Sequence, residues 1–397
     1  MTDLIIVGAG IGGLSLALAH ARISNMSTQR IQVMEKTPAL SEVGAGLQLG
    51  PNAVRHLFAW GLEPALMQVA CEPQRLRVHS MLTGEVLAQR ALGEQNCVRQ
   101  TYGSPYLTLR RADLQQILLQ AVQTCGQIEL GLGQPWRPAT PVEGLGQSVL
   151  VGADGLWSQV RSWAWPETAS PQATGHVAWR ALLQQRDLPA DLRSDSVQVW
   201  LGPRCHVVAY PVLAGEQMNV VAISHQKEPV LLGGAEDFWD QSTELNWVRN
   251  QLLPQAPTPL RGVLEAVPSW RQWPLYDRPP VRAAAEMACG QVALLGDAAH
   301  PMRPYLAQGA AMAIEDAAAL TVCLAEQPGR MGLAAYAQRR WQRCAQVQRA
   351  SQRNGRIFHA SGPFGLVQKA RDASLRLIGA QLLNPSWLYG GGPSPAS

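Results

Sequence analysis

The sequence lacks the patterns that mark disulfide-rich, metal-binding, nucleic-acid-binding and membrane proteins. Its seven cysteines are scattered and never stand as Cys-x-x-Cys, so we expect reduced thiols and no metal site. The net charge is only +4 and no dense basic stretch occurs, which argues against a nucleic-acid partner. The longest stretch of small and apolar residues, 306–326, contains Glu315 and Asp316, and we therefore expect no membrane span.

Signals for export and for disorder are also missing. The first apolar run begins within four residues of Met1, which leaves no room for a signal peptide, so we expect a cytoplasmic protein. Only 16% of the 397 residues are charged and 47% are hydrophobic, a composition that favours a large folded core. This length exceeds that of one small domain, and two interleaved domains are expected.

A nucleotide-binding pattern opens the chain. The short apolar run Leu4-Ile5-Ile6-Val7 reads as a buried parallel strand and leads into Gly8-Ala9-Gly10-Ile11-Gly12-Gly13, followed by a helical stretch of small and apolar residues. A second strand, 31–34, ends at Glu35. This order is the dinucleotide fingerprint, in which the glycines let a pyrophosphate approach the helix start and the acid accepts hydrogen bonds from a ribose.

The stretch 294–320 carries a second signal for the same kind of ligand. An apolar strand runs into Gly296-Asp297, a loop with two prolines follows, and a helix of small residues opens near Gln308-Gly309. Asp297 can accept hydrogen bonds from sugar-alcohol hydroxyls, and Gly309 with Ala310 would let backbone N–H groups approach a ring. The positive end of the helix would lie where reduction places negative charge. This layout suits a bulky, electron-rich cofactor.

The middle of the chain changes character. A strand over 148–155 ends in Asp154-Gly155 and precedes a helix, whereas the alternating runs 196–200 and 206–210 indicate antiparallel strands. On such a strand His206 and Tyr210 share one face. From Leu333 onward we expect helices, whose many arginines are read as a solvated face.

These motifs together resemble the class A FAD-dependent aromatic hydroxylases, and in particular the salicylate hydroxylase-like members. The first glycine turn with Glu35, the Asp154-Gly155 strand end and Gly296-Asp297 occur in the family's order. No second complete glycine fingerprint is present for a nicotinamide nucleotide. The resemblance implies bound FAD, transient NADH or NADPH, and O₂ as co-substrate. Further likeness covers Ala178-Trp179-Arg180, Tyr210-Pro211-Val212, 275–280 and 387–390.

The resemblance assigns cofactor roles residue by residue. Arg111 would reach the FAD, although it could instead form a surface ion pair, and Asp297 would hold the ribitol. Asp154 belongs to a motif for FAD and NAD(P)H, although it could simply cap the following helix. The positions expected at the cofactor are Gly8, Gly10, Ile11, Gly13, Glu35, Lys36, Gly46, Leu47, Arg111, Asp154, Asp297, Gly309 and Ala310.

The expected substrate site lies on the antiparallel strands. Hydroxylation needs an activated ring, which a phenol gains by losing its proton, so a base should be near. His206 and Tyr210 are the candidates and resemble the His-x-x-x-Tyr pair of 6-hydroxynicotinate 3-monooxygenase. Pro304 matches a family proline beside the flavin, with Tyr305 following it into the pocket. For His300 we expect a structural hydrogen bond. Arg204 and Arg303 are the candidates to meet a substrate carboxylate.

The predicted fold is α/β, with a Rossmann-like FAD-binding domain interleaved with a smaller mixed or antiparallel-sheet substrate domain and a C-terminal helical segment. The chain is expected to act as a monomer or homodimer. The predicted segments are 1–75, 102–172 and 286–345 for the FAD-binding domain, 76–101 and 173–285 for the substrate domain, and 346–397 for C-terminal helices and tail.

The predicted activity is hydroxylation of a small phenolic aromatic acid with NAD(P)H and O₂, which the family performs through a flavin C4a-hydroperoxide. The first expectation is a salicylate-like substrate, where OH transfer to the carboxyl-bearing carbon would expel CO₂. The alternative is ring hydroxylation of a hydroxybenzoate or 6-hydroxynicotinate-type acid without loss of the carboxyl group. A different class stays open, namely an NADH oxidase or a non-catalytic FAD binder.

Overall fold

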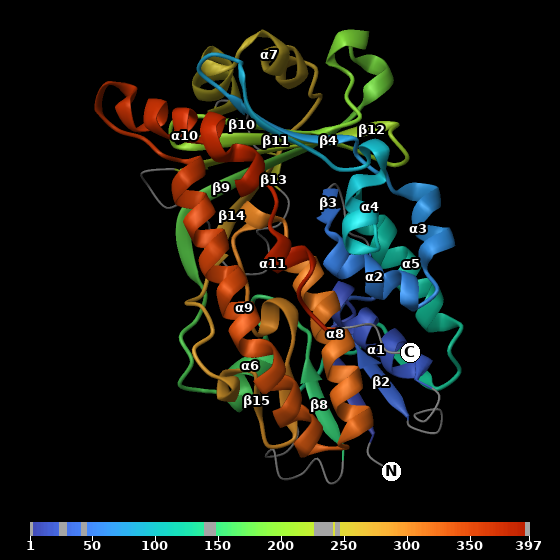
Figure 1. Cartoon of the computed structure of the whole chain (residues 1–397). Helices are drawn as coiled ribbons and strands as arrows, with labels where there is room; N and C mark the ends of the chain where they lie inside the picture. The colour runs from blue at the N-terminus through green and yellow to red at the C-terminus, as the bar shows by residue number, and fades with distance from the viewer. Residues whose placement is uncertain are drawn as a thin grey trace.

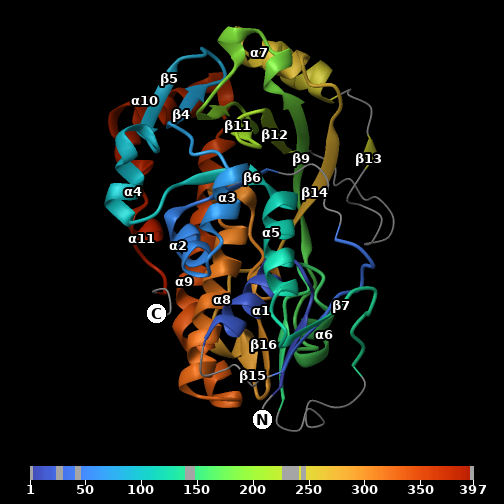
Figure 2. The same ribbon diagram turned by 90° about the vertical axis from the view of Figure 1, so that its right-hand side faces the viewer.

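Two large sheets, a small two-stranded sheet and the helices around them make up the described fold, seen here in a computed structural model. The structure describes residues 3–23, 30–40, 46–138, 148–225, 241–242 and 247–393. Figure 1 shows the smaller sheet in the lower half of the molecule and the larger sheet in the upper half, and Figure 2 shows the same division from the side. Among the described residues, no helix has the length and apolar character needed to cross a bilayer.

The six-stranded sheet has the order β15-β16-β8-β1-β2-β7. Its strands pair in parallel except at the edge, where β15 runs antiparallel to β16. The strands predicted at 4–7 and 31–34 are confirmed at those residues. The bounds are β1 Leu4–Val7, β2 Ile31–Met34, β7 Ile128–Gly131, β8 Val149–Gly152, β15 Ala288–Cys289 and β16 Val292–Leu294.

Long helices pack beside this sheet. Helix α1 (Ile11–Arg22) contacts α5 (Arg111–Gln123) and α8 (Gly309–Glu326), and α8 in turn packs on α9 (Arg330–Phe358). The predicted helix start near Gln308-Gly309 is confirmed, because α8 begins at Gly309. Helix α9 begins beside β15 and β16 and rises to the larger sheet (Figure 1). Its C-terminal end therefore reaches the second half of the molecule.

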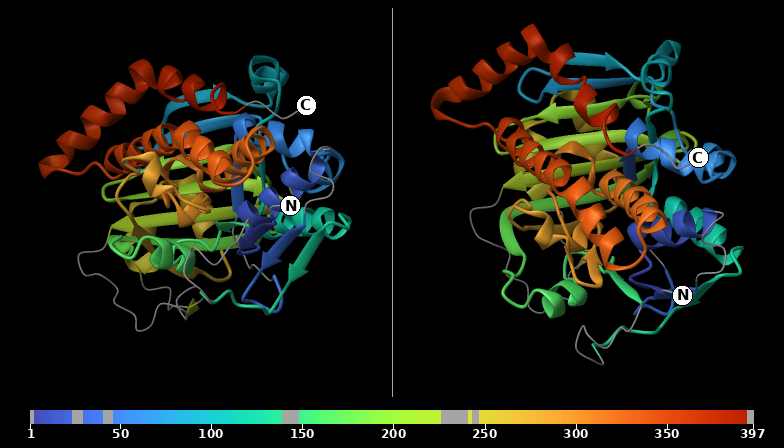
Figure 3. Two further views of the ribbon diagram at one scale, coloured as in Figure 1. Left: turned by 90° about the horizontal axis from the view of Figure 1, so that it is seen from below. Right: turned by 60° about the horizontal axis from the view of Figure 1, so that its bottom comes forward.

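The eight-stranded sheet has the order β13-β14-β9-β12-β11-β10-β4-β5 and is antiparallel except for the pair β10–β4. The antiparallel strands expected near 196–200 and 206–210 are confirmed as β10 and β11. Figure 3 shows these strands side by side behind α8 and α9. The bounds are β4 Arg75–Ser80, β5 Val86–Ala91, β9 Gln172–Gln184, β10 Val197–Leu201, β11 Cys205–Val212, β12 Gln217–His225, β13 Gln241–Ser242 and β14 Arg271–Asp277.

The two faces of the eight-stranded sheet have different coverings. Val207, Ala209 and their neighbours pack in a buried cluster with α7 (Thr258–Glu265), whereas Tyr210 belongs to the core shared with the six-stranded sheet. His206 lies on the same side as Tyr210, since strand residues two apart share a face. The shared face predicted for this pair is therefore confirmed.

Shorter elements join the two halves and close the C-terminal side. Strands β3 and β6 form a two-stranded sheet at the junction, and α10 lies along β5. The predicted C-terminal helices are confirmed as α9, α10 and α11. The remaining bounds are β3 Gly46–Leu49, α2 Pro51–Ala59, α3 Glu63–Val69, α4 Cys97–Tyr102, β6 Leu107–Arg110, α6 Gln159–Ala164, α10 Leu366–Leu382 and α11 Ser386–Tyr389.

Domain boundaries stay a prediction. The strands of the larger sheet come from 75–91 and 172–277, and those of the smaller sheet from segments before, between and after these. The boundary predicted after residue 345 falls inside α9, which continues without a break to Phe358. Residues 1–2 and 394–397 of the predicted segments lie outside the part of the chain that the structure describes.

Candidate active site

The first glycine turn closes because its glycines carry no side chains. A Cβ at Gly13 would lie 1.9 Å from the carbonyl oxygen of Gly8, and Gly8 itself has φ +102°, which L side chains rarely adopt. At Gly10, in contrast, no atom of the described residues lies within 4 Å of where a Cβ would be. Gly10 caps α1 without a side-chain hydrogen bond, so open space lies before a helix start whose first N–H groups need acceptors. A diphosphate fits this position.

Glu35 lies beside that turn at the end of β2. Its Oε2 accepts the N–H of Ala9 at 2.8 Å, and its Oε1 accepts both the N–H and the hydroxyl of Thr37 at 2.9 Å. The carboxylate is thus fixed against the glycine turn, while the neighbouring Lys36 is exposed. This placement is compatible with ribose binding by Glu35, which stays a prediction.

Asp297 and Arg111 meet at the second predicted cofactor contact, although 186 positions separate them in the sequence. The Asp297 side chain is exposed, yet desolvation by the surrounding protein raises the pKa of its carboxyl, against the opposing charges of Arg111 and His300. The Asp297 carboxyl is thus open to solvent on one side and surrounded by protein on the others, as expected for a group that lines a recess. Within the part of the chain that the structure describes, the one atom near a hypothetical Cβ at Gly309 is Oδ1 of Asp297, at 4.0 Å, which leaves space at the start of α8 for a planar ring.

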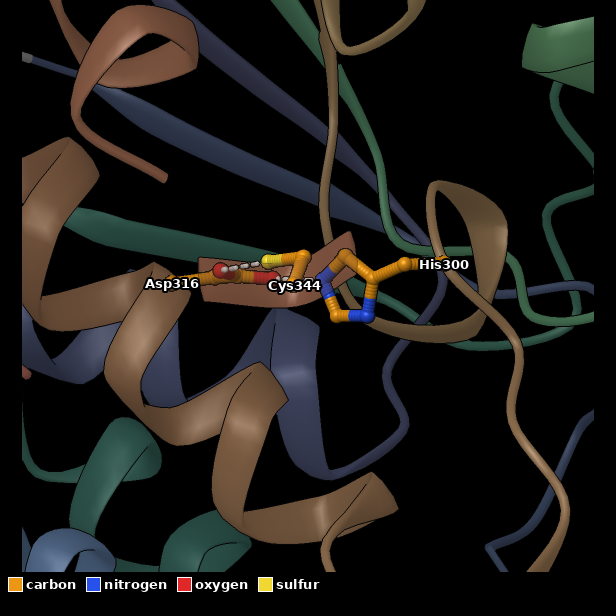
Figure 4. Close-up of side chains that lie close together, drawn as sticks. All are labelled: His300, Asp316 and Cys344. Atoms are coloured by element: carbon orange, nitrogen blue, oxygen red, sulfur yellow. Dashed lines mark hydrogen bonds and ion pairs between the residues drawn. The ribbon is translucent and has the colours of Figure 1, made fainter. Parts of the chain in front are cut away.

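A buried hydrogen-bond network fixes the Asp297 loop from behind. Asp316 of α8 accepts the N–H of Gly296 at 3.0 Å and Nε2 of His300 at 2.5 Å, and its other oxygen accepts Nε of Arg340 at 2.7 Å. The structural role expected for His300 is therefore confirmed. Figure 4 shows His300, Asp316 and Cys344 together, at distances that would also suit a metal ion. Because Arg340 and two N–H groups already satisfy Asp316, we interpret the cluster as structural.

The arginines of α9 correct one sequence expectation. Arg340 is fully buried and Arg343 nearly so, and both bind Glu315, Arg340 at 2.6 Å and Arg343 at 2.7 Å. The prediction of a solvated arginine face was wrong for these two residues, because the acids of α8 require buried cations. It holds for Arg339, which remains exposed beside Glu326.

Asp154 accepts hydrogen bonds from the first turn of α6, whose N-cap residue is Ser158. Its Oδ2 accepts the N–H groups of Gln159 and Val160 at 2.7 and 3.1 Å, and its Oδ1 accepts the hydroxyl of Ser158 at 2.5 Å. The capping alternative is therefore present in the structure. A direct role for Asp154 in binding FAD or NAD(P)H stays a prediction.

An accessible row crosses the middle of the larger sheet, on the face turned toward the smaller sheet. Arg180, Val221 and Val208 are aligned across β9, β12 and β11, and all three are only half-buried. On β11, His206 lies two residues before Val208 and Tyr210 two residues after it. Both of these side chains are buried. The two predicted catalytic side chains thus border an accessible strip of sheet.

His206 lies among aromatic rings at one end of this strip. Its ring centroid is 5.4 Å from that of Tyr305 and 5.2 Å from that of Phe358, and its Nδ1 is 2.8 Å from Nε2 of His359. Burial lowers the pKa of His206 to about 3, so the imidazole is neutral and has a lone pair that can accept a hydrogen bond. The hydroxyl of Tyr305 is buried and has no hydrogen-bond partner among the described residues, and the preceding Pro304 is exposed.

Tyr210 lies at the other end, against β3. A Cβ at Gly46 would be 2.7 Å from the Tyr210 hydroxyl, so only glycine fits there, and Gln48 hydrogen-bonds the phenol. Burial raises the pKa of Tyr210, and the charge of Arg180 opposes that rise. Gly46 and Leu47 therefore lie at the sheet junction, and their predicted cofactor contact stays untested.

Neither Arg204 nor Arg303, the two predicted carboxylate ligands, belongs to the row across the sheet, whereas Arg180 does. Arg303 is engaged by Asp277, with Nε to Oδ2 at 2.8 Å, and Arg204 is exposed in the turn between β10 and β11. The sequence predicts no role for Arg180 beyond its place in the family-like run Ala178-Trp179-Arg180. Its orientation could have been found from strand alternation, since Trp179 and Ala181 face the α7 side.

The recess and the glycine turn fit FAD. The space at Gly10 suits a diphosphate, Glu35 is held beside that turn, where a ribose is predicted, and the Asp297–Arg111 recess lies next to the start of α8. These segments are far apart in the sequence, yet both border α1, which packs on α5 and α8. One extended ligand would connect them.

Comparison with known proteins agrees with this geometry. The family described as "FAD binding domain" matches residues 148–351. The 3-hydroxybenzoate 6-hydroxylase of Polaromonas naphthalenivorans (strain CJ2) is 33% identical over 404 residues, covering 98% of this chain and 95% of that protein. The chain belongs to the class A FAD-dependent aromatic hydroxylases. It is accordingly a flavoprotein monooxygenase that uses FAD, with NAD(P)H as co-substrate.

Two further relatives place this hydroxylase within its family. The 6-hydroxynicotinate 3-monooxygenase of Pseudomonas fluorescens is 31% identical over 372 residues, covering 88% of this chain and 90% of that protein. A salicylate hydroxylase–substrate complex shares the fold, with a TM-score of 0.76 and 21% identity over 100% of this chain and 98% of that one. The predicted fold class is therefore confirmed. The individual site residues stay predictions.

Proposed function

We propose that this hydroxylase adds a hydroxyl group to the ring of a small phenolic acid and leaves the carboxyl group in place. The observation that carries the proposal is the accessible row of Val208, Val221 and Arg180. It is bordered by a neutral imidazole, His206, and by the phenol of Tyr305, whose hydroxyl has no hydrogen-bond partner among the described residues. A flat aromatic ring would lie on the two valines, between His206 and Tyr305 at one end and the cationic Arg180 at the other.

His206 would supply the activation that the reaction requires. FAD reduced by NAD(P)H supplies the activated oxygen when bound, and this oxygen reacts with an electron-rich ring. Because Nδ1 of His206 is engaged by His359, Nε2 is the nitrogen left to take the phenolic proton. Removing that proton raises electron density at the ring carbons ortho and para to the oxygen. Tyr305 would donate its free hydroxyl to the resulting phenolate.

Arg180 would bind the carboxylate. It lies at the β9 end of the row, with Cζ 5.0 Å from the centre of the Trp273 ring, which fixes the guanidinium on the sheet surface. From there its charge reaches the Tyr210 phenol across the sheet. A carboxylate at Arg180 and a phenol oxygen at His206 would hold the ring at both ends.

The ring could be hydroxylated with or without loss of the carboxyl group. Sequence similarity to known hydroxylases favours the reaction that keeps the carboxyl group. Three relatives at 32–35% identity, which match 91–98% of this chain, are by name 3-hydroxybenzoate 6-hydroxylases, and carbon 6 of that acid carries no carboxyl group. The 6-hydroxynicotinate 3-monooxygenase, at 31% identity, by its name acts at carbon 3, which carries the carboxyl group of that acid. The likeness to salicylate hydroxylase is one of fold, at 21% identity. We therefore rank 3-hydroxybenzoate-type acids before salicylate.

A substrate panel tests this function. Purified enzyme would be given hydroxybenzoates, salicylate and 6-hydroxynicotinate, and oxidation of NADH and of NADPH would be followed together with product, CO₂ and peroxide. We expect one acid to accelerate nicotinamide oxidation and to yield a hydroxylated product that retains its carboxyl group. Release of CO₂ would establish the salicylate-type reaction instead. Peroxide as the sole product with every acid would identify an oxidase and overturn the proposal.

Replacement of the base gives the sharper test. His206→Ala should keep FAD but lower substrate-coupled hydroxylation by about 10²-fold, the usual contribution of a general base. His79→Ala is the control, because His79 is a half-buried histidine that stacks on Trp200 on the opposite face of the same sheet. Unchanged coupling in His206→Ala would remove this residue from the mechanism.

We also infer a cytoplasmic location and a site complete within one chain. All seven cysteines are free, which suits a reducing compartment. Both the cofactor positions and the substrate strip come from the same chain, so a monomer or a homodimer would be active. Gel filtration of the purified enzyme at several concentrations decides between these two states.

A further inference from the structure

A row of buried side chains leads from the middle of α8 back to its first residues, where the flavin ring is predicted. Asn52 lies in the first turn of α2, which packs on α8. Its Nδ2 donates to Oε1 of Glu315 at 2.8 Å and to Oε1 of Gln308 at 3.0 Å. All three side chains are buried, and Gln308 directly precedes Gly309, the first residue of α8. One amide of α2 thus binds an acid within α8 and the residue that precedes this helix.

Glu315 sets the orientation of both amides. Arg340 and Arg343 pair with its carboxylate at 2.6 and 2.7 Å. Burial alone would raise the pKa of this carboxyl, but the two arginines and the hydrogen bond from Asn52 lower it below its ordinary value. The ionised carboxylate can only accept, so Asn52 must turn its NH₂ group toward it, and the second N–H of that group then meets the oxygen of Gln308. Asn52 keeps this orientation although its own Oδ1 is buried without a partner in the described part of the chain.

The Gln308 side chain is left with a donor for a ligand. Its oxygen accepts from Asn52, and this is its one side-chain hydrogen bond to a described residue, so its NH₂ group remains. Gln308 is the N-cap residue of α8 but makes no side-chain hydrogen bond to that helix. The first N–H groups of α8 also need acceptors. The side-chain amide and the helix start therefore offer donors at the same place, beside the space at Gly309.

We propose that the NH₂ group of Gln308 donates a hydrogen bond to the flavin ring of bound FAD, and that Asn52 and Glu315 are positioning residues for this donor. The hydrogen-bonding atoms of the flavin ring system belong to its pyrimidine part and the nitrogens next to it, because the outer benzene ring carries only methyl groups. Reduction adds negative charge to the pyrimidine part, and hydrogen bonds to charged acceptors are the stronger ones. The Gln308 donor thus favours the reduced flavin. This role goes beyond the proposed function, since it holds for any aromatic substrate.

The reduction potential of bound FAD tests this role. Gln308→Met removes the donor and keeps an unbranched side chain of similar length. We expect the affinity for reduced FAD to fall about tenfold more than the affinity for oxidised FAD, which lowers the two-electron potential by about 30 mV. Spectra recorded during reduction with a reference dye measure the potential, and fluorescence titration of the apoprotein measures the affinity for oxidised FAD.

Gln185→Met is the matched control. Gln185 is likewise a buried glutamine, and it donates to the carbonyl oxygens of Ser194 and Gly215 at the end of β9. Its replacement removes hydrogen bonds far from the start of α8, so the potential should keep its wild-type value. A fall as large as that in Gln308→Met would overturn the proposal, as would an unchanged potential in Gln308→Met.

Asn52→Leu separates positioning from packing. The potential should fall in the same direction, and Asn52→Leu combined with Gln308→Met should match Gln308→Met alone, because Asn52 acts only through the donor. Additive falls would overturn the positioning role.

A measurement on the wild-type apoprotein decides the case if no variant at position 308 folds. The apoprotein is titrated with FAD and with its 2-thio and 4-thio analogues, whose sulfur accepts hydrogen bonds weakly. Weaker binding of one analogue supports the donor, and equal affinities for all three overturn it. No aromatic acid enters these measurements, so their failure is distinguishable from failure of the proposed function.

Discussion

Glu35 shows how one carboxylate serves both the protein and a ligand. The sequence predicts it as the ribose acceptor, and the structure shows that it also holds the N–H of Ala9 within the glycine turn. Loss of this side chain would therefore free a backbone group of the turn as well as remove a ligand contact. The turn and the cofactor site are coupled through a single residue.

Glu35→Ala should weaken FAD retention by about tenfold or more, since a lost hydrogen bond to a charged group costs about 1.5–3 kcal/mol. FAD content after gel filtration and fluorescence titration of the apoprotein would measure this change. Glu129→Ala is the matched control, because Glu129 is an exposed acid on the next strand that pairs with Arg30. A Glu35→Ala protein that stays fully loaded would contradict the ribose role.

At the scale of elements, the pairing of α8 with α9 supports the cofactor recess. Asp316 binds the backbone of Gly296 and the ring of His300, and Arg340 holds Asp316 and Glu315 from α9. His300 and Arg340 lower the pKa of Asp316 to about 2 against the effect of burial. The loop that carries Asp297 is therefore as rigid as the helix pair behind it.

Arg340→Ala should lower the free energy of unfolding by about 3–5 kcal/mol, because two buried carboxylates lose their shared cation. Arg339→Ala, one position away and exposed, should cost about 1 kcal/mol or less. Denaturant unfolding of both proteins, with FAD content as a second measurement, compares them. Equal stabilities would show that the buried network contributes nothing.

At the scale of the whole molecule, the cluster of His176, His206 and His359 makes the free energy of unfolding depend on pH. Burial lowers the pKa of His206 to about 3, of His176 to about 4 and of His359 to about 2, so the folded protein holds these rings neutral. The unfolded chain takes up protons at them below about pH 6.5. Their contribution to stability is therefore complete above that pH and is lost as pH falls. His300, whose pKa is raised well above its ordinary value, has the opposite sign.

Unfolding free energy should fall between about pH 7 and about pH 5, with a slope of about 1.4 kcal/mol per pH unit for each histidine that protonates only when unfolded. Urea titrations at several pH values measure this slope. His176→Gln should reduce it by up to one such increment, whereas His79→Gln should change it less. A slope that is flat in the wild type would refute the neutral state of the cluster.

Local preferences determined a large part of this protein from its sequence alone. The glycine turn closes only without side chains, and α8 begins at its small residues, so both follow from backbone geometry. Strand alternation alone placed His206 and Tyr210 on one face, because that period holds wherever a strand forms. These features are set by residues next to one another.

Only the tertiary structure decided which distant groups meet. His359 lies 153 positions from His206 in the sequence and meets it because α9 extends from one sheet to the other. No residue pattern within the helix indicates which strand its C-terminal end will contact. In the same way, the arginine-rich sequence of α9 predicts a helix face in solvent. The structure shows instead that Arg340 and Arg343 pair with the buried acids Glu315 and Asp316 of α8. Strand alternation puts Arg180 and Trp179 on opposite faces of β9, but only the tertiary structure shows which of the two faces α7 covers. Contacts of this kind depend on packing, which the sequence encodes only through the whole fold.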